Sequence, residues 1–367
     1  NWPFNGPPRD PTAWLIFVGR NFALDEVRRL KKQIVLPDDD VISDIDDAEE
    51  AMAERLDNSQ YRDDVLRLLF ICCHPDLPVT QQIAVALRIV SGLSVAEIAR
   101  AFLVSESAME QRITRAKRVI AKADVPFEAP GRGEREERLG AVAMMLYLLF
   151  NEGYSASGGE GHIRAPLCEE AIRLARLLLR LFPAEPEIMG LNALLLLQHA
   201  RAPARLDDDG NVVLLENQDR SRWDRSLIAE GLALIEEALH HRRLGPYQVQ
   251  AAIVGVHAQA ATAAETNWDE IDRLYAVLEA VQPSPVVTLN RAVAVNKTQG
   301  PAAALAMIEP LEERLANYFH YFGVKGALLM QLRRNDEARA QFNRALALAH
   351  TPAQAAHIRM HLDHLAP

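Results

Sequence analysis

The sequence has few cysteines, few aromatic residues and no long apolar run. Cys72, Cys73 and Cys168 are the only cysteines among 367 residues, an odd and low count that excludes a disulfide framework and is typical of a reducing compartment. No run of apolar residues reaches the roughly 20 positions that cross a bilayer, and no stretch has the pattern of a secretory signal. We therefore expect a cytoplasmic protein that does not associate with a membrane.

Basic residues are outnumbered over the whole chain, 40 Lys and Arg against 50 Asp and Glu, and the net charge of −10 argues at first against nucleic-acid binding. The charges are unevenly distributed, however. Residues 88–122 hold seven Lys or Arg against three Glu, whereas residues 38–64 hold twelve Asp or Glu against two Arg. A chain that is acidic overall can bind DNA when the contacting surface is basic. Residues 88–122 are therefore a candidate DNA-binding segment.

The usual patterns of metal binding and catalysis are missing as well. Residues 72–74 (Cys-Cys-His) lack the usual ligand spacing and a second ligand pair, which favours a buried helix end over a metal site. Residues 207–211 (Asp-Asp-Asp-Gly-Asn) do not reproduce a calcium loop with its distal Glu and favour a turn beside a short extended piece. Glu152, Tyr154 and His162 share a polar loop, but no nucleophile elbow or phosphate loop accompanies them, so a packed interdomain loop is favoured. We expect no metal, no cofactor and no enzymatic activity.

The most informative stretch is residues 93–118, which predicts two short helices joined by a tight turn. Ser94 and Ser105 are good N-caps for these helices. Met109, Ile113 and Ala116 recur at helical spacing and are predicted to face inward. The outward positions of the second helix carry short polar groups early, where base edges are read, and cations later, where phosphates lie. The predicted DNA-contacting residues are Ser105, Glu106, Ser107, Glu110, Gln111, Arg112, Arg115, Lys117 and Arg118.

An ordinary helical hairpin with a solvated basic face would give a similar pattern, so the details of the motif matter. The segments 93–99 (Leu-Ser-x-x-Glu-Ile-Ala), 104–107 (Val-Ser-Glu-Ser) and 112–118 (Arg-x-x-Arg-Ala-Lys-Arg) resemble the −35-binding domain of bacterial sigma factors. The type that they resemble is the short, extracytoplasmic-function sigma factor. Upstream, Trp14-Leu15, Arg20-Asn21, Asp25 and Arg28-Arg29 resemble the helix that ends the −10-binding domain of such factors. Two matches in the right order are more specific than either one alone.

The resemblance implies a domain order. Residues 1–35 would be a remnant of sigma domain 2, residues 36–58 an acidic linker, and residues 59–125 sigma domain 4. The N-terminal part of the −10-binding domain, with the helices that grip the polymerase clamp, would precede residue 1. The linker is either a plain solvated tether or, as the resemblance implies, an imitation of nucleic acid in the RNA-exit path of the polymerase. The residues implied to contact the −10 region are Arg20, Asn21, Arg28 and Arg29.

Between this part and the C-terminus, several elements are expected from local signals. Residues 126–135 are rich in Pro, Gly and charge and predict a hinge. Residues 138–150 are almost wholly apolar after their first turn, which predicts a helix buried on most sides. Residues 151–166 are expected to form a polar loop, and residues 220–224 to begin a further helix.

The C-terminal part carries an internal repeat. Four small or apolar residues recur at the same spacing 34 residues later: Ala292, Ala304, Ile308 and Leu311 as Gly326, Ala338, Phe342 and Ala345. This period is typical of tetratricopeptide (TPR) repeats, and residues 135–367 resemble the TPR extension of one subgroup of these sigma factors. Stacked helix pairs would form a superhelix with a concave face for a protein or peptide ligand. Polar residues that either line this face or merely face solvent are Asn290, Arg291, Asn296 and Lys325.

The predicted fold is all-α: a partial −10-binding helical domain, a helix-turn-helix −35-binding domain and a C-terminal TPR-like α-solenoid. The predicted function is that of a sigma factor that directs core RNA polymerase to specific promoters, with the TPR-like domain as a regulatory or scaffold element. Promoter DNA and core RNA polymerase are the implied partners. The alternative is a TPR-containing helix-turn-helix activator that binds DNA without acting as sigma. The segment 14–29 and the acidic linker favour the sigma factor, because an activator needs neither.

Overall fold

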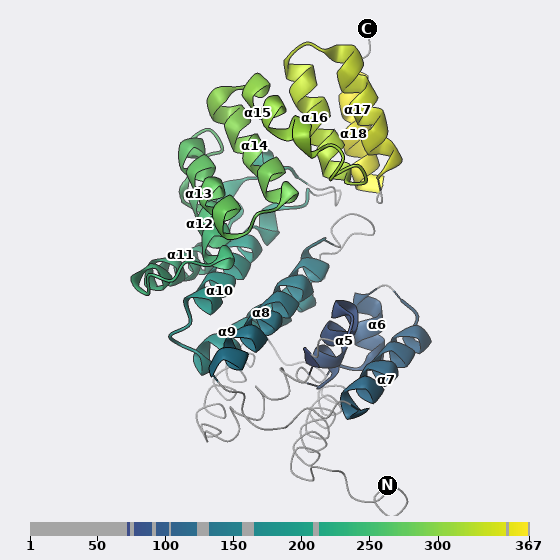
Figure 1. Ribbon diagram of the computed structural model, residues 1–367, viewed down its shortest axis with the longest axis vertical. Helices are drawn as coiled ribbons and strands as arrows, with labels where there is room; N and C mark the ends of the chain where they lie inside the picture. Colours follow the sequence, from purple (N-terminus) through teal and green to yellow (C-terminus); the bar gives the residue numbers. More distant parts are fainter. Residues whose placement is uncertain are drawn as a thin grey trace, which may run out of the picture. The chain divides into compact units, whose positions relative to one another are not determined.

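The computed structural model describes residues 72–73, 77–89, 93–102, 104–122, 132–155, 165–207, 213–349 and 352–365. The regular elements in these ranges are helices, and no strand forms among them, which confirms the all-α prediction (Figure 1). The chain divides into two compact units, Asn1–Leu149 and Phe150–Pro367. The finer domain boundaries expected from the sequence stay predictions.

The first unit contains three consecutive helices, α5 (Val79–Ile89), α6 (Val95–Ala101) and α7 (Glu106–Lys122), each of which packs against the other two. A further helix, α8 (Arg132–Ser155), begins inside the predicted hinge and ends inside the predicted polar loop. Most apolar side chains of α8 between residues 139 and 149 are buried, as expected, whereas Met144 is 53% exposed. The thiol of Cys73 lies 3.8 Å from the sulfur of Met145 on α8. The boundary between the two units falls within α8.

The second unit contains ten further helices among the described residues. Each packs against the next one along the chain, and α10 also packs against α12, which is the neighbour-to-neighbour pattern of a helical solenoid. Figure 1 shows the later helices as a row of adjacent hairpins. The helices are α9 (Ala165–Leu181), α10 (Pro186–His199), α11 (Arg225–His240), α12 (Pro246–Gln259), α13 (Trp268–Val281), α14 (Pro285–Gln299), α15 (Pro301–Ile308), α16 (Phe319–Gln331), α17 (Asn335–Ala347) and α18 (Pro352–His364).

An insertion between α10 and α11 interrupts this order. It contains three short 3-10 turns, η2 (Ala202–Ala204), η3 (Leu215–Asn217) and η4 (Arg220–Arg222). Its two ends meet, because the backbone N–H of Asp224 donates a hydrogen bond of 2.9 Å to the carbonyl of Ala200. The helix expected to begin at residues 220–224 begins instead at Arg225. The reason is local: the Asp224 carboxylate accepts the N–H groups of Ser226 and Leu227 at 2.9 and 3.0 Å and so caps α11.

Helix α12 is capped from a distant part of the chain. Its N-cap residue, Gly245, has no side chain to offer. The carboxylate of Glu187, in the first turn of α10, accepts the backbone N–H of Tyr247 at 2.8 Å and the side-chain amide of Gln248 at 3.2 Å. Burial raises the pKa of Glu187, and the hydrogen bonds from Tyr247 and Gln248 act in the opposite direction. A partly buried acid on one helix therefore satisfies the free amides of another.

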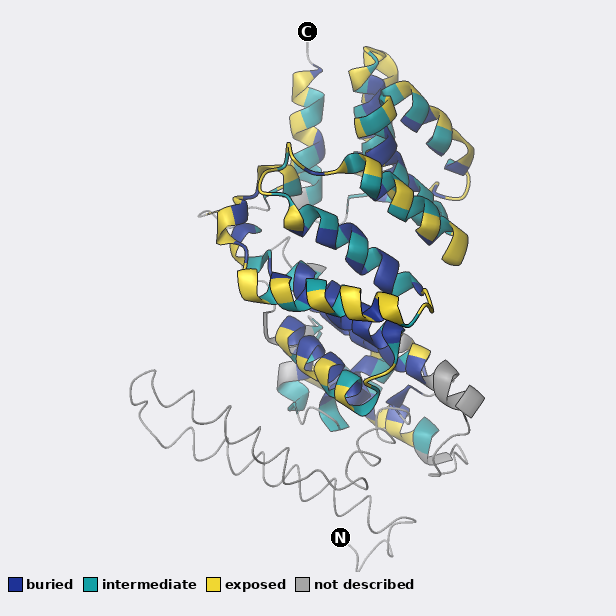
Figure 2. Cartoon of the chain, turned by 90° about the vertical axis from the view of Figure 1, so that its left-hand side faces the viewer, coloured by how far each residue is buried: buried dark blue, intermediate teal, exposed yellow. Residues whose placement is uncertain are grey.

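The recurring positions of the C-terminal repeat lie where the sequence predicts them. All eight are buried, in the helix pairs α14–α15 and α16–α17 and the η5 turn (Glu309–Leu311). A Cβ atom on Gly326 would lie 2.7 Å from the Phe342 ring, so only glycine lets α16 approach α17 this closely. Figure 2 shows that individual helices of the second unit carry buried residues along one side and exposed residues along the other. The 34-residue spacing thus marks helix-to-helix contacts.

Candidate nucleic-acid interface

The helix-turn-helix is built from local backbone and capping contacts. The Ser105 hydroxyl accepts the N–H of Ala108 at 3.2 Å, so Ser105 caps α7 as the sequence predicts. The turn before it closes through a hydrogen bond of 3.1 Å from the Val104 N–H to the Ala99 carbonyl. Arg88, near the end of α5, donates 2.9 Å to the Leu93 carbonyl and thereby holds the segment that leads into α6. From the sequence, Arg88 is only one of the cations of the candidate DNA-binding segment 88–122, and this positioning role was not predicted.

The inner side of α7 anchors the helix to the unit. Met109, Ile113 and Ala116 are each at most 4% exposed, which confirms the predicted inward face. They belong to the buried set that includes Ile98 and Ala99 of α6. Since one side of α7 is fixed by apolar packing, the direction of the other side is fixed as well.

The outer side of α7 presents the predicted contact residues to solvent. All of them are exposed except Arg112, which is half-buried. Short polar and acidic side chains precede the cations along this side, as in the sequence prediction. Such an order suits base edges near the helix N-terminus and phosphates farther along. The exposed residues are Ser105, Glu106, Ser107, Glu110, Gln111, Arg115, Lys117 and Arg118.

The electrostatic environment of this surface differs along the helix. Partial desolvation lowers the pKa of Lys117, and the positive charge of Arg88 lowers it further. A nearby phosphate would oppose both effects, because a negative charge favours the protonated amine. Arg88 therefore holds the turn in place and also adds to the positive potential at the far end of α7.

The structure describes only some of the other sites considered from the sequence. Arg20, Asn21, Arg28 and Arg29, with the acidic linker 36–58, lie outside the described residues. Among the residues that the structure describes, no group of three or more His, Cys, Asp or Glu side chains can hold a metal ion. Cys72 and Cys73 are buried, as expected for a helix end, and burial raises the pKa of the Cys73 thiol to about 12. No described helix is long and apolar enough to cross a membrane.

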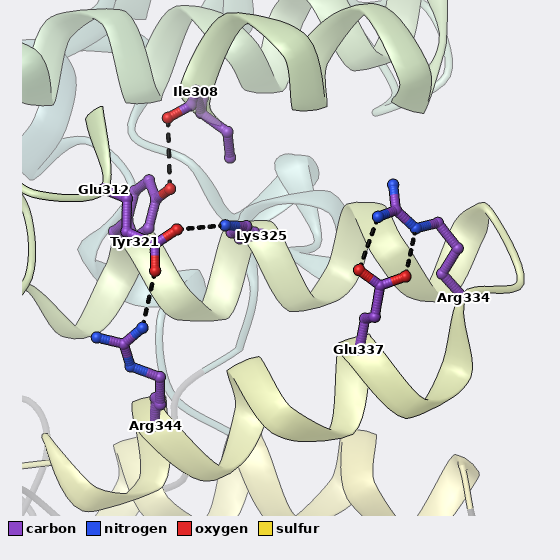
Figure 3. Close-up of polar contacts among 7 residues, drawn as sticks. All are labelled: Ile308, Glu312, Tyr321, Lys325, Arg334, Glu337 and Arg344. Carbon is purple, nitrogen blue, oxygen red and sulfur yellow. Dashed lines mark hydrogen bonds and ion pairs between the residues drawn. The ribbon is translucent and has the colours of Figure 1, made fainter. Parts of the chain in front are cut away.

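The polar residues expected on the solenoid surface are largely engaged within the chain. Arg291 on α14 forms ion pairs of 2.7 Å with both Asp272 and Glu279 on α13. Figure 3 shows Lys325, on α16, pointing to the carboxylate of Glu312, with which it forms an ion pair of 2.6 Å. The same carboxylate forms an ion pair of 2.8 Å with Arg344 on α17. These ion pairs tie neighbouring helices together. Of the other two residues, Asn290 is exposed and Asn296 is half-buried.

Comparison with known proteins supports the helix-turn-helix assignment. Residues 67–120 match the family model of sigma-70, region 4, which covers α5, α6 and nearly all of α7. Residues 138–239 match a family of unknown function, DUF6596, which covers most of α8 and all of α9 and α10 and reaches into α11. Over 366 residues the chain is 64% identical to an uncharacterized protein of Rhizobium meliloti (strain 1021), and the match spans 100% of this chain and 86% of that protein. The chain belongs to the family of this Rhizobium meliloti protein.

The match to sigma-70, region 4 coincides with the helix-turn-helix geometry described above. It supports a sigma-70-type, DNA-binding role in transcription for this family member, and this domain type is not enzymatic. The DUF6596 match begins inside α8 and ends at the last turn of α11, so it includes the insertion between α10 and α11. The insertion is thus part of the region that the family model describes.

Proposed function

We propose that this protein is a sigma factor that directs core RNA polymerase to specific promoters. The observation that carries the proposal is the solvent-facing side of α7, held by buried Met109, Ile113 and Ala116 within a domain that matches sigma-70, region 4. Under this proposal, residues from Ser105 to Arg118 bind the −35 element. Promoter DNA and core RNA polymerase are its partners, its site of action is the cytoplasm, and it catalyses no reaction of its own.

The contacts to the −10 region are proposed on the sequence resemblance. Arg20, Asn21, Arg28 and Arg29 would contact the DNA backbone or the melted strand. The double charge reversal Arg28→Glu with Arg29→Glu should abolish open-complex formation and leave −35 binding intact, because α7 is unchanged. Permanganate reactivity of the promoter measures melting, and normal melting in the double variant would show that this assignment is wrong.

The repeated helices of the second unit are proposed to be a TPR-like regulatory or scaffold element. The support is the buried 34-residue register around Gly326 and Phe342, together with packing between successive helices. Its concave face would bind a protein or peptide. Since Arg291 and Lys325 already form ion pairs within the chain, any ligand that they bind would have to compete with Asp272, Glu279 and Glu312.

Run-off transcription with purified core polymerase tests the proposed function. A sigma factor allows core polymerase to start at a cognate promoter without any other factor. An activator, the alternative, gives a transcript only when a separate sigma factor is added. The double variant Arg115→Glu with Arg118→Glu should lose the transcript, because it reverses charge on the exposed side of α7. Arg359→Glu, on an exposed position of α18, is the matched control and should retain it. Absence of transcript from core polymerase with the wild-type chain, on promoters selected by this protein, would reject the sigma factor.

A further inference from the structure

Three arginines of the second unit lie close together, and no described carboxylate forms an ion pair with any of them. Arg201, Arg205 and Arg220 all belong to the insertion between α10 and α11. Among the described residues, none of the three takes part in an ion pair. This contrasts with Arg291 on α14, which binds two carboxylates. We call these three residues, together with Trp223, the arginine cluster.

Neutral groups hold the three guanidinium groups in place. Arg201 donates hydrogen bonds of 3.3 Å to the side-chain carbonyl of Gln218 and of 3.1 Å to that of Gln198. Arg205 donates 2.9 Å to the Tyr154 carbonyl, and its Cζ atom lies 3.5 Å from the centre of the Tyr154 ring. These contacts orient the positive charges, but neutral amides and aromatic rings do not neutralise them.

Arg220 is the most deeply buried of the three, with only 5% of its surface exposed. It donates hydrogen bonds of 2.7 and 2.9 Å to the backbone carbonyls of His257 and Ala260, and one of 3.0 Å to the hydroxyl of Thr266. These contacts fasten the insertion to the end of α12 and to the turn that follows. The most buried cation of the cluster therefore has neutral hydrogen-bond acceptors only.

The charges of the cluster act on one another. The Cζ atoms of Arg201 and Arg220 lie 5.8 and 5.0 Å from the centre of the same Trp223 ring. Burial lowers the pKa of Arg201, and the charge of Arg205 lowers it further while Tyr154 acts in the opposite direction. Burial likewise lowers the pKa of Arg220. The positive charge of Arg201 lowers this pKa further, and the negative charge of Glu265 raises it. Buried like charges are costly unless a counter-charge joins them.

Two buried donors in the cluster also lack an acceptor. The indole Nε1 of Trp223, a residue only 2% exposed, has no hydrogen-bond partner within the described part of the chain. The same is true of the Nε of Arg220. A buried donor without a partner is unusual and costs free energy. Within the described part of the chain, the cluster thus has no carboxylate paired with its arginines and no acceptor for two of its donors, and one oxyanion supplies both.

We propose that the arginine cluster is a binding site for a phosphate dianion, either free or as the phosphate group of a small metabolite. Three charged guanidinium groups match a dianion better than a single carboxylate does. Arg201 and Arg205 would bind its oxygens from the solvent side, and Arg220, whose terminal nitrogens are engaged, would contribute its charge and its unpaired Nε. Arg201 and Arg205 are half-buried rather than fully buried, so they form the side of the cluster that solvent reaches. The cluster shares no residue with the helix-turn-helix, and the proposal does not depend on the proposed promoter binding.

The indole N–H of Trp223 provides a direct readout of this site. The full chain is labelled with 15N-indole tryptophan, which gives four signals, and the Trp223 signal is assigned with Trp223→Phe. Inorganic phosphate and glycerol phosphate are titrated separately at constant pH, with ionic strength held constant by sodium chloride. We expect a saturable shift of the Trp223 signal, while Trp268 serves as an internal reference for folding. Saturation by phosphate alone identifies a free-phosphate site, and tighter binding of glycerol phosphate identifies a phosphorylated metabolite.

Two variants and one control complete the test. Arg201→Gln and Arg205→Gln should each weaken binding roughly tenfold or more, because each removes one guanidinium fork. Arg359→Gln, on an exposed position of α18, should leave the affinity unchanged. If Arg201→Gln disturbs the Trp268 reference signal, Arg201→Lys keeps the charge without the fork and takes its place. The proposal is overturned by the absence of a saturable shift in the wild-type chain, or by equal affinity in wild type and the arginine variants. Since no polymerase or DNA is present, either result leaves the sigma-factor proposal untouched.

Discussion

Gln111 and Arg115 give a paired test of how α7 binds promoter DNA. Both side chains are exposed, and neither forms a hydrogen bond or ion pair within the part of the chain that the structure describes. Truncation to alanine therefore removes no described hydrogen bond or ion pair of the folded protein, and stability should stay within about 0.5 kcal/mol of wild type. Any larger loss of DNA affinity in Gln111→Ala or Arg115→Ala belongs to the DNA contact itself.

The two substitutions should reduce DNA affinity in different ways. Gln111 lies in the earlier, polar part of the exposed side, where a side chain that reads a base edge contributes about 1–3 kcal/mol of discrimination. Gln111→Ala should thus lose roughly 5- to 150-fold in affinity on the preferred sequence and much less on a sequence changed at one base pair. Arg115 lies one turn later, among the cations. Arg115→Ala should weaken binding to all sequences alike.

Salt dependence separates a phosphate contact from a base contact. Each phosphate contact adds about 0.9 to the slope of log affinity against log salt concentration. Between 50 and 200 mM salt, wild type should therefore lose roughly 3.5-fold more affinity than Arg115→Ala, whereas Gln111→Ala should keep the wild-type slope. Fluorescence anisotropy with −35 DNA and single-base variants measures both quantities. Equal, sequence-independent losses in the two variants, with equal slopes, would refute direct readout by this helix.

Three further predictions concern the second unit. Phe342→Ala should lower the free energy of unfolding by about 3–5 kcal/mol, because the fully buried ring fills the space beside Gly326; urea unfolding measures this, and a loss below that of Phe342→Leu would contradict it. Asp224→Ala should cost about 1 kcal/mol through the lost cap of α11, with a local rise in amide exchange at residues 226 and 227 as the confirming observation. Burial lowers the pKa of His257 to about 4. As the pH falls, the imidazole is therefore protonated in the unfolded chain, where a His pKa is about 6.5, before it is protonated in the folded chain. Stability should then fall by about 3 kcal/mol between pH 6.5 and 4, and His257→Gln should flatten this part of the thermal-melting profile against pH; an unchanged profile would speak against a buried neutral imidazole.

Local periodicity made much of this fold predictable from the sequence. Met109 and Ile113 face inward because apolar residues at helical spacing must share one side of a helix. Ser105 caps α7 because a hydroxyl at that position satisfies free amides a few residues ahead. Gly326 and Phe342 were found because a 34-residue repeat reports contacts between neighbouring helices. In each case the signal lies within one helix or one repeat.

Long-range contacts set the limits of such prediction. Arg88 was counted as a surface charge, because nothing in the local sequence shows that its guanidinium holds the Leu93 carbonyl. Arg291 and Lys325 were weighed as ligand-binding or solvated residues, but their partner carboxylates lie 12 to 19 residues away on other segments. The arginine cluster gave no sequence signal at all. Its members come together only when the insertion folds back on α12, as the contacts of Arg220 show.

The cap that Glu187 provides to α12 has a consequence for the order of folding. Helices α11 and α13 have local caps, from Asp224 and Asn267, and their first turns can form before any tertiary contact. Helix α12 cannot satisfy its first amides in this way, because the carboxylate that accepts the Tyr247 N–H lies 60 residues earlier. Its first turn therefore becomes stable only after α10 has docked. We expect α10 and the start of α12 to gain protection from hydrogen exchange in a single cooperative step, although α11 lies between them in the sequence.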